Sequence, residues 1–183
     1  MKRGFITGIQ TPYRIRCSEN TSTLLRPGSS ALNRRLESHG HNFLGLKGVL
    51  LVDYQPEKTT MTGPYYGEVL TNLRQAVKEK RRGMLTRGSL LLHDNAPAHM
   101  SQVAQAIVKD IEFEQLSYPP YSPDLTPSDL CQFRHLKQHV RGTRFIDDSE
   151  LKQATESYLD SMPPEFYLTG IKELFDRCQK CTD

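Results

Sequence analysis

Two aspartates stand where a carboxylate would be held firmly and still face solvent. Asp94 ends residues 89–94, a short run dominated by three leucines that indicates a buried strand, and Asn95-Ala96-Pro97 then predicts a turn. Asp129 follows Thr126-Pro127-Ser128, which is typical of a helix start. Both are candidate catalytic acids. Each also has a structural explanation, as the acid of an Asx-turn for Asp94 and of a capping box for Asp129.

A second candidate group is basic. Lys and Arg number 24 against 21 Asp and Glu, and the resulting net charge of +3 is too small to indicate nucleic-acid binding by itself. Five cations nevertheless gather just before the Asp94 strand, at Lys78, Lys80, Arg81, Arg82 and Arg87. They could follow the phosphates of DNA. The alternative is a solvated helix end whose cations complement the helix dipole.

Length and composition limit the class of protein. A chain of 183 residues, 37% hydrophobic and 25% charged, suits one soluble globular domain and excludes collagen-like and fully disordered chains. No apolar run approaches the length of a membrane span, and the first residues lead into no signal-peptide core. We therefore expect an intracellular protein with no membrane segment. The single Cys178-Gln179-Lys180-Cys181 pair does not make a zinc site.

The apolar pattern predicts an α/β domain of mixed strands and helices. We expect strands at 48–54, 89–94 and 113–118, a Pro-rich loop at 118–127, and helices at 63–82, 98–109, 127–140, 149–162 and 164–180. The helix at 98–109 should bury Val103, Ala104 and Ile107. Residues 1–46 show little pattern, so we expect an irregular N-terminal segment there and a folded domain over 47–183.

Two blocks carry a family resemblance. His93-Asp94-Asn95-Ala96-Pro97-Ala98-His99 and Tyr118-Pro119-Pro120-Tyr121-Ser122-Pro123-Asp124-Leu125-Thr126-Pro127-Ser128-Asp129 resemble the hallmark blocks of mariner-type DNA transposases. The 34 residues between Asp94 and Asp129 match the spacing of that family's acids. Weaker similarity at 49–54, 65–66 and 166–171 extends the resemblance over about 47–183.

The resemblance implies a ribonuclease H-like fold, a mixed sheet flanked by helices, in which three acids gather around two Mg²⁺ or Mn²⁺ ions. Asp94 and Asp129 would be catalytic metal ligands, and His93 and Asn95 would shape the site. The implied reaction is cleavage and strand transfer of DNA, with DNA as partner, a homodimer as in relatives, and the nucleus as location. Two metal ions can activate the attacking oxygen and stabilise the leaving one in such a displacement.

The first of the three acids that the family resemblance implies has no counterpart in this chain. In relatives it directly follows a strand similar to Phe5-Ile6-Thr7-Gly8, whereas this chain has Ile9, with Gln10 where a glutamate is usual. Residues 1–46 therefore look like a degenerate remnant of the first strands. They also lack the pattern of the helix-turn-helix modules with which relatives read transposon ends. We expect an impaired enzyme that binds DNA weakly and without sequence preference; the alternative is a non-catalytic remnant that binds nucleic acid or protein.

Overall fold

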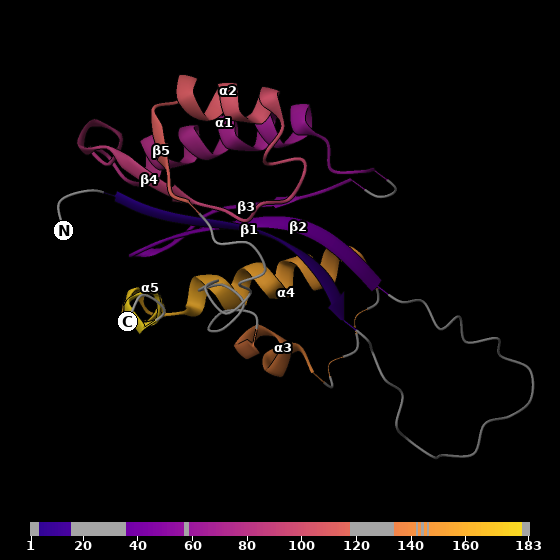
Figure 1. The fold of residues 1–183 in the computed structure, drawn as a ribbon. Coiled ribbons are helices and arrows are strands. Elements are labelled where there is room, and N and C mark those ends of the chain that lie inside the picture. The colour runs from indigo at the N-terminus through magenta and orange to yellow at the C-terminus, as the bar shows by residue number, and fades with distance from the viewer. Residues whose placement is uncertain are drawn as a thin grey trace, which may run out of the picture.

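The computed structural model describes residues 4–15, 36–56, 59–117, 134–141, 143, 145 and 147–180. Its centre is a five-stranded sheet in the order β3-β2-β1-β4-β5 (Figure 1). The strands are β1 (Gly4–Ile15), β2 (Leu36–Gly45), β3 (Gly48–Tyr54), β4 (Ser89–Leu92) and β5 (Phe113–Gln115). β1, β2 and β3 pair antiparallel, while β4 is parallel to both β1 and β5. The sheet is mixed, as the sequence predicted.

Helices cover both faces of the sheet (Figure 1). One face carries α1 (Gly63–Lys80) and α2 (Gln102–Asp110), and a 3₁₀ turn, η1 (Leu85–Arg87), leads into β4. The other face carries α3 (Arg134–Val140), α4 (Asp148–Ser161) and α5 (Pro164–Lys180). None of the helices in the described part of the chain is both long and apolar enough to cross a membrane.

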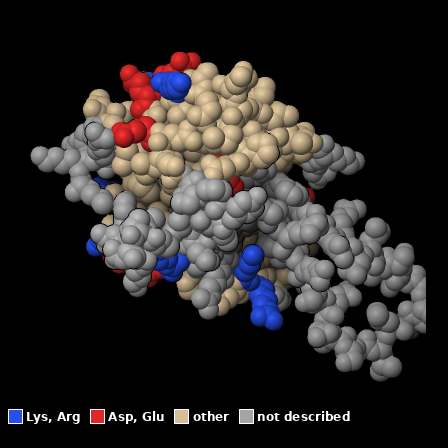
Figure 2. Space-filling view, in the orientation of Figure 1, with Lys and Arg blue, Asp and Glu red and all other residues tan. Residues whose placement is uncertain are grey.

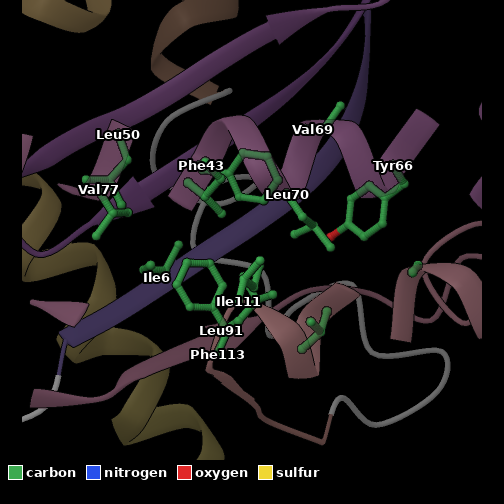
Figure 3. Close-up of a cluster of buried hydrophobic side chains, with 13 residues drawn as sticks. Ile6, Phe43, Leu50, Tyr66, Val69, Leu70, Val77, Leu91, Ile111 and Phe113 are labelled. Atoms are coloured by element: carbon green, nitrogen blue, oxygen red, sulfur yellow. The ribbon is translucent and has the colours of Figure 1, made fainter. Parts of the chain in front are cut away.

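The larger core lies between the sheet and α1 with α2. Ile6, Phe43 and Leu91 point from three neighbouring strands toward Leu70 of α1 (Figure 3), and all four are fully buried, as is Leu73 of the same cluster. Burying each such side chain stabilises the fold by about 1.5 to 3 kcal/mol relative to leaving it exposed. The apolar residues whose spacing predicted a helix over 63–82 therefore form the buried face of α1.

The opposite face of the sheet has its own apolar contacts. Phe5 and Leu92, the sequence neighbours of Ile6 and Leu91, pack with Ile171 and Leu174 of α5. Alternate residues of a strand face opposite sides, so a strand covered on both sides must be apolar at consecutive positions. This is why the leucines of β4 form an unbroken run.

The N-terminal segment corrects one expectation. Regular structure was expected to begin near Gly48, but β1 and β2 are strands that pair over ten residue positions, from Ile6 with Gly45 to Ile15 with Leu36. Thr, Gly, His and Asn in these strands hid the pattern, because pairing with neighbours on both sides supplies stability that local propensity does not. The division of the chain into 1–46 and 47–183 stays a prediction.

Helix α2 also differs from its prediction. It begins at Gln102, because the side chain of Ser101 caps it by accepting a hydrogen bond from the backbone N–H of Ala104 at 3.2 Å. Ala104 is buried as expected, but Val103 is 47% exposed and Val108 takes the second buried position. The predicted burial of Val103 was wrong because the face of α2 that packs on the core consists of Ala104, Ile107 and Val108, and Val103 lies outside it.

Gly8 allows the closest strand contact of the core, and this generates a prediction. A Cβ at position 8 would lie 2.2 Å from Cε1 of the buried Phe43 ring. We expect Gly8→Ala to lower the free energy of unfolding by about 1 to 3 kcal/mol in urea denaturation, the usual cost of overpacking. Gly45→Ala, whose Cβ would meet Leu50 at 3.3 Å, is the matched control and should cost less.

The double variant Gly8→Ala with Phe43→Leu tests the cause. Removing the Phe43 ring should recover part of the free energy of unfolding that Gly8→Ala loses. The effects of the two substitutions on that free energy should therefore depart from additivity by at least about 0.5 kcal/mol. Strictly additive effects would show that Gly8 is required for another reason.

Candidate functional site

Asp94 follows the end of the β1–β4 pairing. The parallel pairs between these strands end at Thr7 with Leu92, two residues before Ile9 in β1 and two residues before Asp94 in the segment after β4. β1 continues beyond this point and pairs Ile9 with Asn42 of β2. The candidate site therefore lies where β4 ends against the middle of β1, a position that α/β sheets often use for function.

The carboxylate of Asp94 is held through one of its two oxygens. Oδ1 accepts a hydrogen bond from the backbone N–H of Ala96 at 3.2 Å and from Nδ1 of His99 at 2.6 Å. The Ala96 bond is the predicted Asx-turn. Oδ2 forms no hydrogen bond with the described residues, and the side chain is 37% exposed. Among the described residues, the hydrogen bonds to this carboxylate thus all go to Oδ1.

The charge of Asp94 is favoured by its surroundings. Burial acts to raise the pKa of this carboxyl, but the hydrogen bond and nearby charge of His99, with the Ala96 N–H, outweigh burial and hold the pKa below its usual value. Asp94 is therefore ionised at neutral pH. An exposed, ionised oxygen on a fixed carboxylate is suited to bind a cation.

Four buried rings lie behind Asp94. They are His41 of β2, Tyr66 of α1, His93 after β4 and His99 before α2, each at most 1% exposed. The His99 ring centre lies 3.9 Å from that of Tyr66, 5.4 Å from His93 and 5.6 Å from His41. We refer to these four residues as the ring cluster. Elements far apart in sequence meet here, directly behind the candidate acid.

Most polar atoms of the ring cluster have no partner. Both ring nitrogens of His41, Nε2 of His99 and the Tyr66 hydroxyl are buried without a hydrogen bond to the described residues. Burial lowers the pKa of His41 to about 3 and that of His93 to about 4, so both rings are neutral. Unpaired buried polar groups cost about 1 to 3 kcal/mol each. Such groups are uncommon in proteins and often mark functional sites.

The remaining predicted acid and its neighbours are placed as follows. Asp129 lies outside the described residues, so its distance from Asp94 stays a prediction. Asn95 is exposed beside Asp94, and His93 is buried in the ring cluster. Asp53 accepts a hydrogen bond from the Tyr65 hydroxyl at 2.8 Å. That bond gives Asp53 a separate structural role.

The predicted basic residues lie at the far end of α1. The helix begins against the turn before α2, where Gly63 meets Ser101, and runs 18 residues, about 27 Å, away from it. Lys78, Lys80 and Arg82 are exposed at its C-terminal end, and the side chain of Arg87 lies outside the described residues. The basic group therefore lies at the opposite end of α1 from the segment between Asp94 and α2.

Arg81 differs from the other cations of this group. Its Nη2 donates to the carbonyl of Lys47 and its Nη1 to the carbonyl of Lys80, both at 3.1 Å. These bonds tie the end of α1 to the turn between β2 and β3.

In Figure 2 acidic side chains gather over the upper left, where α2 ends and β5 lies in Figure 1, and the visible basic side chains are scattered.

The candidate metal ligands can be tested against this geometry. Asp94 fits a ligand because it is ionised, partly exposed and has a free oxygen. Position 9 does not fit, because an isoleucine side chain has no donor atom. Within the described ranges no group of three or more His, Cys, Asp or Glu side chains is arranged to hold a metal ion. Of the expected metal ligands, the described residues thus supply Asp94.

The sequence analysis missed the roles of His41, Tyr66 and His99. His99 was part of the first hallmark block, and its spacing five residues after Asp94 in a turn was the available signal. Tyr66 was part of the weaker similarity at 65–66. His41 carried no local signal, because its segment has no apolar period.

The neutral His41 generates a pH prediction. Because the folded-state pKa of about 3 lies below the ordinary 6.5, the unfolded chain takes up the proton first. Its contribution to stability is therefore complete above about pH 6.5 and is lost as the pH falls toward 3. Between about pH 7 and pH 4.5 we expect His41 to account for about 2 to 3 kcal/mol of lost stability.

Urea denaturation at both pH values checks this expectation. His41→Phe should reduce the fall in stability by that amount, whereas His135→Gln, at an exposed histidine of α3, should leave the fall unchanged. Identical pH profiles for His41→Phe and the parent would contradict the buried, neutral state of this ring.

Comparison with known proteins shows two relatives of greater length. The human histone-lysine N-methyltransferase SETMAR is 34% identical over 125 residues, which are 68% of this chain and 18% of SETMAR. The Mariner Mos1 transposase of Drosophila mauritiana is 30% identical over 136 residues, which are 73% of this chain and 39% of that transposase. The chain thus spans less than half the length of either relative. A family model described as transposase (partial DDE domain) matches residues 44–87.

Solved structures agree with the sequence relatives. The crystal structure of the catalytic domain of Mos1 mariner transposase matches with a TM-score of 0.79 at 25% identity, covering 97% of this chain and 79% of that one. The Mos1 catalytic domain with Raltegravir and Mn matches with a TM-score of 0.81 at 24% identity, covering 97% and 80%. The fold is the expected ribonuclease H-like one. The chain belongs to the mariner-type DNA transposases and corresponds to a portion of their catalytic domain.

Proposed function

We propose that this chain is a catalytically impaired form of a domain for metal-dependent DNA cleavage and strand transfer. The observation that supports the proposal is the strand register: the parallel pairs between β1 and β4 end at Thr7 with Leu92, so Ile9 and Asp94 each come two residues after the last pair. Position 9 is where the family resemblance expects the first acid. A hydrocarbon side chain there can neither bind a cation nor accept a proton.

The chain retains the other part of the expected site. Asp94 offers a fixed, ionised carboxylate with one free oxygen, and Asp129, from the sequence, would supply a second carboxylate. When bound, Mg²⁺ or Mn²⁺ would polarise the phosphate and activate the attacking oxygen. A structure of the Mos1 catalytic domain is described as containing Mn, which supports this choice of metal. The role of Asp94 is to hold its free oxygen toward the cation.

A non-catalytic role in DNA binding is the second candidate. Exposed Lys78, Lys80 and Arg82 at the end of α1 favour it, since exposed cations bind phosphates without reading sequence. Their position far from Asp94 means that DNA bound there need not pass the acid. A chain that had lost catalysis could therefore keep this contact.

Restoring the acid tests the first proposal. The parent should bind Mn²⁺ weakly in calorimetric titration and should not cleave duplex DNA with Mg²⁺ or Mn²⁺. Ile9→Asp should tighten Mn²⁺ binding by about tenfold or more, equivalent to about 1.4 kcal/mol, because it adds a charged oxygen ligand beside Asp94. Asp94→Ala should abolish binding in both backgrounds.

Two controls separate charge from other effects. Ile9→Asn adds polarity without charge and should give a smaller gain, while Asp53→Ala removes a carboxylate bound to Tyr65 and should not change Mn²⁺ affinity. DNA cleavage by the parent that disappears in Asp94→Ala would mean that another acid replaces the one missing at position 9, and the proposed impairment would be wrong.

Salt dependence tests the DNA contact. Binding to duplexes of two unrelated sequences should be equal, with dissociation constants of roughly 10⁻⁴ to 10⁻⁶ M at physiological salt. Lys80→Ala with Arg82→Ala should flatten the slope of log K against log salt by up to about 1.8, since each neutralised phosphate contributes about 0.9. Arg81→Ala is less suitable, because it also breaks the bond to Lys47.

Removal of two other exposed cations provides the comparison. Lys109→Ala with Lys172→Ala lowers the net charge equally but acts on α2 and α5. It should leave the slope nearly unchanged. Equal slopes for both double variants would assign Lys80 and Arg82 to an ordinary solvated helix end.

A further inference from the structure

His99 is the strongest contact of the candidate acid. Its Nδ1 lies 2.6 Å from Oδ1 of Asp94, and the imidazole is 1% exposed. An ionised carboxylate can only accept hydrogen bonds, so Nδ1 must carry the proton. The tautomer of the ring is therefore determined by Asp94, and the bond is charge-assisted.

The other ring nitrogen cannot act on a substrate. Nε2 of His99 is buried and has no hydrogen-bond partner among the described residues. An Asp–His pair that served as a general base would need this nitrogen to reach the reacting group. Burial excludes that role, so any effect of His99 on chemistry must pass through Asp94.

The ring is held from three sides. The backbone N–H of His99 donates to the carbonyl of Ala96 at 2.9 Å, and its own carbonyl accepts a hydrogen bond from Nε2 of Gln105 at 3.0 Å. Its face packs on Tyr66, with ring centres 3.9 Å apart. Helix α1 and the start of α2 thus fix the donor before it meets the carboxylate.

Two donors therefore set the orientation of Asp94. Nδ1 of His99 and the N–H of Ala96 both converge on Oδ1, which leaves Oδ2 as the oxygen without a partner in the described structure. We propose that His99 is a positioning residue that fixes the Asp94 carboxylate so that Oδ2 faces a divalent cation. The inference rests on the proposed role of Asp94 as a metal ligand. Partners that orient a ligand commonly change metal affinity by 10- to 100-fold.

The test compares two substitutions at position 99. His99→Leu keeps an apolar group against Tyr66 but removes the donor, whereas His99→Asn can place its amide N–H near the position of Nδ1. Mn²⁺ titration should show a dissociation constant about 10- to 100-fold higher for His99→Leu. His99→Asn should stay within about threefold of the parent. Urea denaturation confirms that each variant is folded.

Three controls make the outcomes distinguishable. His41→Phe changes a ring that neighbours His99 but has no bond to Asp94, so Mn²⁺ affinity should not change. If His99→Leu fails to fold, His99→Gln replaces it, because its longer amide reaches the position of Nε2 instead of Nδ1. Asp94→Ala tests the underlying metal site separately.

Each result supports or overturns one statement. Unchanged Mn²⁺ binding in Asp94→Ala would overturn the proposed function. Loss of binding in Asp94→Ala with parental affinity in His99→Leu would overturn the positioning role and leave the proposed function intact. Equal weakening of Mn²⁺ binding in His99→Asn and His99→Leu would also overturn the positioning role, because loss of the Nδ1 donor would then not be the cause of the weaker binding.

Discussion

The parallel pairing of β1 with β4 is the constraint on which the rest of the structure depends. It joins residues 4–7 to residues 89–92, 85 positions apart in the sequence, and it places strands that are apolar on both faces in the middle of the sheet. Such strands require helices on both sides, which α1 and α5 supply. Position 9 and Asp94 each come two residues after the last of these pairs, so the core strands and the start of the candidate site share one set of backbone hydrogen bonds.

The ring cluster shows a conflict between stability and site geometry. His41 and His99 occupy positions that leucine would fill without unpaired nitrogens, and burial keeps His41 and His93 neutral. The arrangement provides a rigid hydrogen-bond donor behind Asp94. Oδ1 of Asp94 is hydrogen-bonded, and Oδ2 has no hydrogen-bond partner among the described residues. The contacts that hold the Asp94 carboxylate are present although position 9 is an isoleucine.

Helix α1 connects and separates the two candidate functions. Its N-terminal part contributes Tyr66 to the ring cluster, and its C-terminal end presents Lys78 and Lys80 and is tied by Arg81 to the β2–β3 turn. Because α1 is a rigid helix of 18 residues, its two ends lie about 27 Å apart. Cation binding at Asp94 and phosphate contact at the basic end are therefore separable by mutation.

The sequence by itself determined the mixed α/β class, the extents of α1 and α5, and the Asx-turn at Asp94, because helical period, turn residues and the three leucines of β4 are local signals. It also revealed Ile9 in the place of an acid, through resemblance to a family. Only the tertiary structure decided that residues 4–15 and 36–45 are strands, that Val103 is exposed, and that His41, Tyr66 and His99 meet behind Asp94. These features depend on pairing and packing between distant segments, and no local pattern records which segments will meet.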